Sequence, residues 1–127
     1  MDKKSLGQCG EDIAVEYFHR RGYRIVERNF VARVHLGKQI GELDIVAKKG
    51  SNFIFIEVKT GTEGGVAPEM HVTPWKARRL IRAARLWLAK QKKSDAAWQI
   101  DVLAVRAKPD GIFDVAHIEQ AIGEDGI

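Results

Sequence analysis

The stretch "FIFIEVKT", residues 53–60, decides the fold of this chain. Four large apolar residues come first, and Glu57 and Lys59 then follow on either side of Val58. Because strand side chains alternate between two faces, Glu57 and Lys59 share the face of the two phenylalanines, and Val58 shares the face of the two isoleucines. Both faces begin apolar, which is typical of an interior strand covered on both sides. An acid and a base at the end of such a strand indicate a functional site.

Length and composition set the outer bounds. A chain of 127 residues predicts one domain, residues 1–127, and 45% hydrophobic residues are typical of a globular protein. The apolar runs are far shorter than the roughly 18 residues of a membrane helix, and the N-terminus lacks the apolar segment of a signal peptide. A single cysteine, Cys9, forms no internal disulfide, so we expect a cytoplasmic protein without a membrane partner. The four histidines show no metal-ligand spacing with Cys9, which argues against zinc.

Positive charge is concentrated in one segment. Residues 73–93 hold eight of the 21 lysines and arginines and no acidic residue. The rest of the chain holds the other 13 basic residues against all 17 acidic ones, and is therefore mildly acidic. This asymmetry predicts an anionic partner at one surface.

The hydrophobic pattern predicts the order α-β-β-β-α-β-β, an α/β fold in which helices flank a small mixed sheet. Gly22 is the expected stop of the first helix. Thr73 is the expected N-cap of the second, with Pro74 in its first turn. The glycine-rich residues 61–70 predict a mobile loop. The expected helices are residues 6–22 and 74 to about 93, and the expected strands are 24–34, 40–48, 53–60, 97–107 and 112–118, the last at an edge.

Acidic residues gather where the second and third strands meet. Glu42 and Asp44 are expected on one face of the second strand, with Leu43 and Ile45 opposite. If the two strands pair as a hairpin around residues 49–52, Asp44 lies near Glu57. Carboxylates held that close in a partly buried site repel each other at a cost of about 1 kcal/mol or more.

A divalent cation removes this repulsion. Magnesium prefers carboxylates, a carbonyl and water, so we expect Mg²⁺ or Mn²⁺ on Asp44, Glu57 and the carbonyl of Val58, with Glu42 as a further ligand or a supporting residue. Lys59 is expected to orient or deprotonate an attacking water, or to neutralise a phosphate. The simpler alternative is that Glu57 and Lys59 form an ion pair at a fraying strand end.

Five segments carry a family resemblance, in chain order: "GEDIAVEYFHRRGYRIVERNF" (10–30), "GELDIVAKKG" (41–50), "FIFIEVKT" (53–60), "VTPWKARRLIRAARLWL" (72–88) and "IDVLAV" (100–105). They resemble the YraN-type family of small bacterial proteins, within the PD-(D/E)xK nuclease superfamily, which is similar to archaeal Holliday-junction resolvases. The resemblance implies a restriction-endonuclease-like fold. Its implied catalytic residues are Glu11, Asp44, Glu57 and Lys59.

Three positions need a second interpretation beside the family pattern. Gly61 and Gln99 stand where the family usually has arginines, which leaves the candidate metal ligands intact but weakens the expected DNA contacts. Glu11 lies near the edge of the apolar face of its helix, so it can look toward the sheet. It is otherwise a solvated acid in the first turn, favoured by the helix dipole.

The second helix has two distinct sides. Its predicted core stripe is Ala77, Leu80, Ile81, Ala84 and Leu88. The residues expected to bind nucleic acid are Lys76, Arg78, Arg79, Arg82 and Arg85. A basic stripe is usually only a solvated face, but the absence of any acid argues for phosphate contacts. The three tryptophans, Trp75, Trp87 and Trp98, either stack on bases or, as is commoner in a small domain, lie in the core.

Three functions fit this sequence. The first is a magnesium-dependent endonuclease that cuts branched or otherwise structured DNA; because resolving a junction takes two cuts, it predicts a homodimer with paired sites. The second is a nucleic-acid-binding module of the same fold that cuts nothing alone and works with a partner ATPase or helicase. The intact acids and lysine favour the enzyme, and the missing arginines favour the module. The third is a structural α/β domain whose acidic cluster has no function.

Overall fold

The computed structural model describes residues 3–62 and 72–122, with side chains from Ser5 onward. The elements are α1 (Lys3–Arg20), β1 (Arg24–Arg33), a 3₁₀ turn η1 (His35–Gly37), β2 (Gln39–Lys49), β3 (Asn52–Thr62), α2 (Pro74–Lys90), β4 (Trp98–Ala107) and β5 (Phe113–Ile122). The predicted order α-β-β-β-α-β-β and the α/β class are therefore confirmed.

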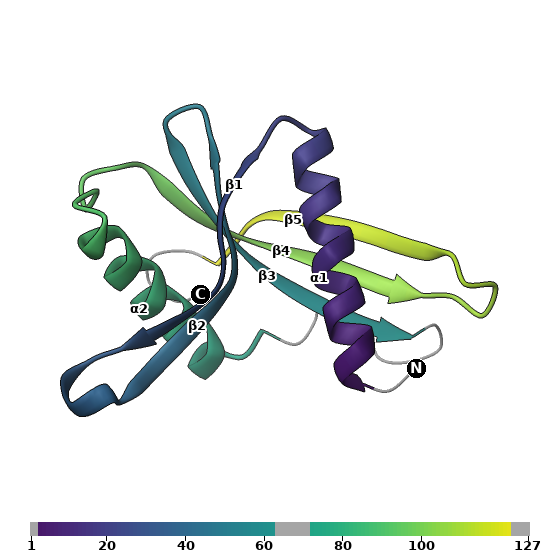
Figure 1. Ribbon diagram of the computed structural model, residues 1–127, viewed down its shortest axis with the longest axis horizontal. Helices are drawn as coiled ribbons and strands as arrows, with labels where there is room; N and C mark the ends of the chain where they lie inside the picture. The colour runs from purple at the N-terminus through teal and green to yellow at the C-terminus, as the bar shows by residue number, and fades with distance from the viewer. Residues whose placement is uncertain (1–2, 63–71, 123–127) are drawn as a thin grey trace.

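The strands form one five-stranded sheet in the order β1-β2-β3-β4-β5, which Figure 1 shows as a strongly twisted layer. Neighbouring strands are antiparallel except β3 and β4, which are parallel. A parallel pair needs a crossover connection, and α2 lies on that crossover. The sheet is thus mixed, as expected of a restriction-endonuclease-like core.

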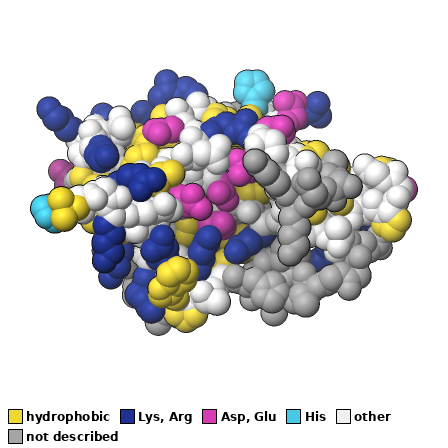
Figure 2. All heavy atoms as spheres, turned by 60° about the horizontal axis from the view of Figure 1, so that its bottom comes forward, with side chains coloured by type: hydrophobic (Ala, Val, Ile, Leu, Met, Phe, Trp, Pro, Cys, Tyr) yellow, Lys and Arg dark blue, Asp and Glu magenta, His cyan; other side chains and the backbone are white. Residues whose placement is uncertain are grey.

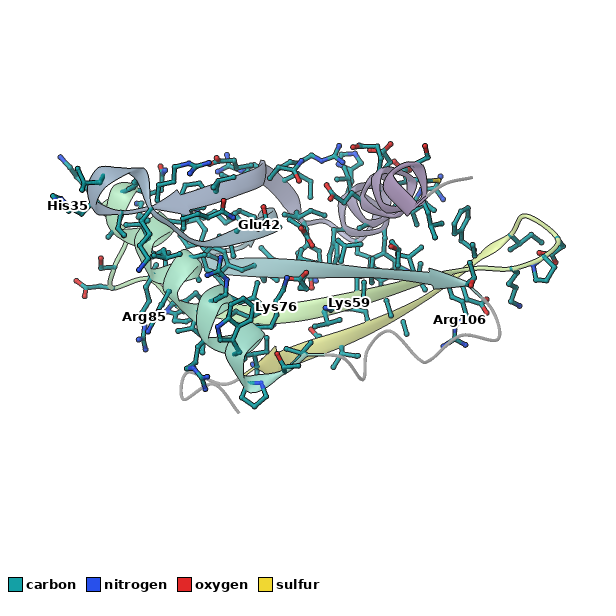
Figure 3. All side chains as sticks on the ribbon, turned by 90° about the horizontal axis from the view of Figure 1, so that it is seen from below. His35, Glu42, Lys59, Lys76, Arg85 and Arg106 are labelled. Carbon is teal, nitrogen blue, oxygen red and sulfur yellow. The ribbon has the colours of Figure 1, made fainter. Side chains whose placement is uncertain are left out.

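The two helices cover opposite faces of β3. The phenylalanines of this strand pack with Trp87 of α2, and its isoleucines pack with Phe18 of α1. Figure 3 shows α1 on one side of the sheet and α2 on the other. The interior position predicted for residues 53–60 is confirmed. Neither α1 nor α2, the helices of the described part of the chain, has the length and apolar character needed to cross a membrane.

Two glycines let the helices approach the sheet closely. A Cβ on Gly41 of β2 would lie 2.5 Å from the backbone oxygen of Arg79 in α2. A Cβ on Gly10 of α1 would clash with Cγ2 of Thr60 in β3. Each glycine directly precedes an acidic residue, Glu42 or Glu11, so the close approaches set the positions of both acids.

The ends of two strands differ from the predictions. Strand β3 continues through Gly61 to Thr62, because its parallel pairing with β4 extends to Thr62 and Ala107. The loop predicted for 61–70 is therefore wrong for its first two residues, and the rest of it lies outside the described residues. Strand β5 runs on to Ile122 instead of ending at 118, since its pairing with β4 resumes after an irregularity near Ile100.

Both helices also shift at their ends. Helix α1 begins at Lys3 and ends at Arg20, and the predicted stop Gly22 has a φ of +85°. The N-cap Thr73 is confirmed, since its side chain accepts a hydrogen bond from the backbone N–H of Lys76. Helix α2 ends at Lys90, before the predicted Lys93, because Lys92 has a left-handed φ of +57°.

Candidate functional site

The site forms where β2 and β3 stop pairing. Their antiparallel register runs from Lys49 and Asn52 to Ile45 and Ile56 and ends there. Beyond these paired residues, the backbone N–H of Val58 donates to the side-chain oxygen Oδ2 of Asp44 at 2.8 Å. A side-chain carboxylate thus takes the place of a backbone carbonyl of β2 as the acceptor.

The alternation of β2 is interrupted at Asp44. Leu43 packs in the core cluster on the α2 side, whereas Ile45 packs in the cluster on the α1 side. The prediction that both lie on one face, opposite Glu42 and Asp44, is wrong. The break accompanies an irregularity on β1, where Asn29, between the partners of Ile45 and Leu43, has a positive φ of 55°. This irregularity leaves the Asp44 carboxylate at the point where the strands separate.

Glu57 is buried beside Asp44, as the predicted hairpin requires. Its residue exposure is 6%, and its carboxyl group shares a hydrogen bond with that of Asp44. Burial and the Asp44 charge raise the pKa of Glu57 to about 8, although Lys76 and Lys59 act against the rise. Glu57 therefore keeps its proton to a higher pH than an ordinary glutamate does.

The pKa of Asp44 is raised as well. Burial raises its pKa, while the hydrogen bond from the Val58 N–H and that from Glu57 lower it again. The exposed Glu42 adds a like charge that raises the pKa further. A buried and a partly buried carboxyl group that lie side by side with raised pKa values are typical of a functional site.

Glu11 approaches this pair from α1. Its side chain is 20% exposed, and its Oε1 atom has no hydrogen-bond partner among the described residues. Burial and the Asp44 charge raise its pKa, and Arg28, whose Nη2 lies 3.7 Å from Oε1, lowers it. The alternative of a solvated first-turn acid is wrong, because α1 begins at Lys3 and places Glu11 in its middle.

Two lysines act on Glu57. Lys59 lies close enough to lower its pKa, and Nζ of Lys76 is 3.7 Å from its Oε1. Lys76 was expected on the phosphate-binding face, and sequence reasoning missed its contact with Glu57. Lys76 lies four residues, about one helical turn, before Leu80 of the core stripe. This spacing, which puts Lys76 on the side of the helix that faces the sheet, was the available signal. Figure 3 shows Lys59, Lys76 and Glu42 near the middle of the molecule, with His35 at one end and Arg106 toward the other.

The other predicted nucleic-acid-binding residues lie further along α2. Arg78, Arg82 and Arg85 are exposed, and Arg79 is partly buried with its guanidinium 4.9 Å from the ring centre of Trp75. Figure 2 shows acidic side chains gathered on one face of the molecule with lysines and arginines around them. The predicted core stripe of α2 is confirmed, since all five of its residues are buried.

The three tryptophans have different surroundings. Trp87 is 2% exposed and donates from Nε1 to Oε1 of Glu27 at 2.9 Å. Trp98 is partly buried against the core cluster on the α2 side. Trp75 is 61% exposed. Core packing therefore accounts for two of the three, and Trp75 remains on the surface.

A second cluster lies between β4 and β5. One ligand atom each from Asp101, His117 and Glu119 lies within 4.8 Å of the others, so these residues form a possible metal-binding triad. Asp101 is fully buried, and its Oδ2 is 2.7 Å from Nε2 of His117. Its Oδ1 accepts from Gln99 Nε2 at 2.8 Å and from the Gln120 N–H at 3.0 Å.

Sequence reasoning missed this triad because it compared the histidines only with the cysteine. The available signal was His117 two residues before Glu119, a spacing that puts both side chains on one face of a regular strand. The triad includes an imidazole nitrogen, whereas the Asp44 and Glu57 pair offers oxygen only. Mg²⁺ takes oxygen ligands, so the carboxylate pair suits it better.

Residues 10–105 match the sequence model of "Uncharacterised protein family UPF0102". The chain belongs to the UPF0102 family. This is the YraN-type family that its motifs resemble, so that prediction is confirmed. The match spans α1 through most of β4 and contains the Asp44 and Glu57 pair.

Several UPF0102 proteins are similar over most of their length. One from Geotalea uraniireducens is 42% identical over 121 residues, covering 94% of this chain and 91% of that protein. One from Geobacter metallireducens is 44% identical over 106 residues, covering 83% and 82%. One from Mycobacterium avium is 42% identical over 127 residues, covering 97% and 93%. Their names state no activity, so membership of the UPF0102 family assigns none.

A solved structure of SfsA from Pyrococcus furiosus, in complex with Ca²⁺, is a more distant match. It is 18% identical with a TM-score of 0.40, and the match covers 93% of this chain and 64% of the length of SfsA. A TM-score this low supports no inference about activity.

Proposed function

We propose that this UPF0102 protein is a Mg²⁺- or Mn²⁺-dependent endonuclease that cuts branched or otherwise structured DNA in the cytoplasm. One observation carries the proposal: the buried Glu57 lies beside the partly buried Asp44, both with raised pKa values, next to a helix that presents only basic charge. A structural role alone would favour apolar residues here, because a buried pair of carboxyl groups destabilises the folded state once both are ionised.

The donor atoms of the pair fit a hard divalent cation. Asp44 and Glu57 supply carboxylate oxygens, and replacing their shared proton by a cation removes the repulsion between the ionised groups. Within a strand, the N–H and C=O of one residue point to the same edge, so the Val58 carbonyl points toward the Asp44 side. These three residues would hold the ion. When bound, it would supply Lewis-acid stabilisation of a phosphodiester and a more acidic water.

The remaining residues have separate tasks in this proposal. Lys59 lowers the pKa of Glu57 through its positive charge, and in this proposal it donates hydrogen bonds that orient the attacking water or neutralise the phosphate. Lys76 takes part in the same cluster from α2. Glu11 completes the acidic side from α1, and the nearby Arg28 guanidinium offsets its negative charge. The exposed arginines of α2 bind the DNA backbone, and a homodimer would supply paired sites for a junction.

Cleavage of a labelled panel tests the proposal. Single strand, duplex, flap and four-way junction are incubated with Mg²⁺ or Mn²⁺ and with the wild-type, Glu57→Ala and Lys59→Ala proteins. We expect metal-dependent cutting of a branched substrate by the wild type and its loss in both variants. His117→Ala is the control, because it removes a ligand of the second cluster only. Cutting that survives in Glu57→Ala would contradict the proposal.

A second candidate is the non-cleaving nucleic-acid-binding module that serves a partner ATPase or helicase. The observation that favours it is the side chain of Gln99, which donates to buried Asp101 in the place of a family arginine and offers no positive charge to DNA. Binding of the panel without cutting, unchanged in Glu57→Ala, would support the module.

A further inference from the structure

Trp75 is an exposed tryptophan with a cation over one face of its ring. It is 61% exposed in the first turn of α2, just after the capping residue Thr73 and Pro74. The guanidinium of Arg79, one turn further along the helix, lies 4.9 Å from its ring centre. A cation over one ring face restricts the side chain while most of its surface stays open to solvent. Tryptophan is enriched at interfaces, where its large apolar rings meet a partner.

The ring borders a pocket beside the carboxylate pair. The pocket has a volume of about 220 Å³ and is lined by Glu42, Trp75, Lys76, Arg79 and Leu80; we call it the Trp75 pocket. Lys76 joins the two sites, because it lines the pocket and its Nζ also lies 3.7 Å from Oε1 of Glu57. Pockets for drug-sized ligands measure roughly 300–1,000 Å³, so this one suits a smaller, flat group.

The aromatic face of Trp75 distinguishes which part of a nucleic acid fits the pocket. The pocket wall carries the acidic Glu42 and the basic Lys76 and Arg79, and both basic groups already have partners, Lys76 with Glu57 and Arg79 over the Trp75 ring. A base can stack on the open face of the ring, whereas a phosphate has no aromatic surface to offer. Phosphates instead find the exposed Arg78 and Arg82 on the same helix. Figure 2 shows hydrophobic side chains exposed among lysines and arginines on this face.

We propose that the Trp75 pocket binds one unpaired nucleobase by stacking on Trp75, while the backbone of the same strand runs along the arginines of α2. The inference rests on the proposed nucleic-acid function and narrows its substrate to DNA with an unpaired nucleotide next to the cut. Aromatic stacking is available to any base, because every base has a π face. Bases inside a duplex are already stacked, and extruding one costs a few kcal/mol.

Tryptophan fluorescence tests the inference on the wild-type protein. An oligodeoxynucleotide is added as a single strand or as a blunt duplex of the same sequence, with EDTA present so that no cutting occurs. We expect the single strand to quench the emission much more than the duplex does. The quench should disappear in Trp75→Phe, in which the largely buried Trp87 and Trp98 still emit. Equal quenching by both forms, or a quench that persists in Trp75→Phe, would overturn the inference.

Affinity provides the second readout. Trp75→Ala should weaken single-strand binding by about five- to 150-fold, the range for removal of one stacking partner, and leave duplex binding within about twofold. Arg78→Ala is the matched control, since a missing phosphate-binding side chain should weaken both forms equally. An equal weakening of both forms in Trp75→Ala would overturn the inference.

The proposed function and this inference fail in different ways. If the wild type binds neither DNA form, both fail. If it binds or cuts DNA and Trp75 has no selective effect, the inference alone fails. If single strands quench Trp75 but no substrate is cut, the pocket stands and the protein is the non-cleaving module.

Discussion

The carboxyl groups of Glu57 and Asp44 lie together at the point where β2 and β3 cease to pair, and the charge of Asp44 raises the pKa of Glu57. Asp44 also accepts from the N–H of Val58, so the aspartate that ends the ladder is the one that acts on Glu57. The fold thus places two acids where neither is solvated enough to ionise freely. This relationship governs how the protein responds to pH and to cations.

The stability of the metal-free protein should fall as pH rises. The folded pKa of Glu57, about 8, lies above its ordinary value of 4.5, so protonation stabilises the folded state. This contribution is complete below pH 4.5 and is lost as pH rises through about 8. At about 1.4 kcal/mol per pKa unit, the loss amounts to a few kcal/mol. Thermal melting in EDTA between pH 5 and 9 measures it.

The matched variant for this prediction is Glu57→Gln, which keeps a donor toward Asp44 but does not ionise. Its melting temperature should depend less on pH and exceed that of the wild type at pH 9. If wild type and variant give parallel curves, Glu57 has no raised pKa in the folded protein.

Gly41→Ala should destabilise the protein. The added Cβ would lie 2.5 Å from the backbone oxygen of Arg79, so α2 must move away from β2. Overpacking of this kind costs about 1–3 kcal/mol, which urea unfolding measures. Gly7→Ala is the control, because a Cβ there meets nothing within 4 Å and alanine favours the helix. A destabilisation in Gly7→Ala as large as that in Gly41→Ala would show that the clash is not the cause.

The salt dependence of DNA binding should identify the basic face of α2. Replacing the exposed Arg78, Arg82 and Arg85 by alanine removes up to three side chains that can bind phosphate. The slope of log affinity against log salt should then become shallower by about 0.9 for each phosphate that the protein no longer neutralises. Arg24→Ala, an exposed arginine on β1, should leave the slope unchanged. An unchanged slope in the triple variant would remove α2 from the interface.

Asp101→Ala should be strongly destabilising. It leaves the Gln120 N–H, the Gln99 amide and the His117 ring without the acceptor that each has now. Unsatisfied buried donors cost about 1–3 kcal/mol each, so a decrease of about 3 kcal/mol or more in the free energy of unfolding is expected in urea. The exposed Asp95→Ala should stay within about 0.5 kcal/mol of wild type. A small effect at Asp101 would mean that water replaces the aspartate as acceptor.

Local sequence patterns are sufficient to predict much of the fold. The run of apolar residues in 53–60 predicts an interior strand, and the structure covers both of its faces. A turn over residues 49–52 between two apolar runs predicts the hairpin that brings Asp44 to Glu57. Thr73 and Pro74 predict the start of α2. Each of these signals lies within a few residues of the feature that it predicts.

The missed features depend on distant partners. The break at Asp44 accompanies the positive φ of Asn29 on another strand, which no pattern within β2 reveals. The contact of Asp101 with His117 requires the register between β4 and β5, including its shift next to Ile100. Pairing registers with irregularities are set by the assembled sheet, so periodicity along one strand cannot predict them.

Calorimetric titration with Mn²⁺ tests most directly the claim that Asp44 and Glu57 form a cation site. Titrations at pH 7 in two buffers of different ionisation enthalpy give both the affinity and the number of protons released. Because the raised pKa of Glu57 favours its protonated form at this pH and a ligand carboxylate must be ionised, we predict binding with release of about one proton. Glu57→Gln and Asp44→Asn should lose this binding, and His117→Ala should keep it. Binding without proton release would contradict a protonated Glu57 in the metal-free site. Binding that only His117→Ala abolishes would contradict the account as a whole and move the cation to the cluster of Asp101, His117 and Glu119.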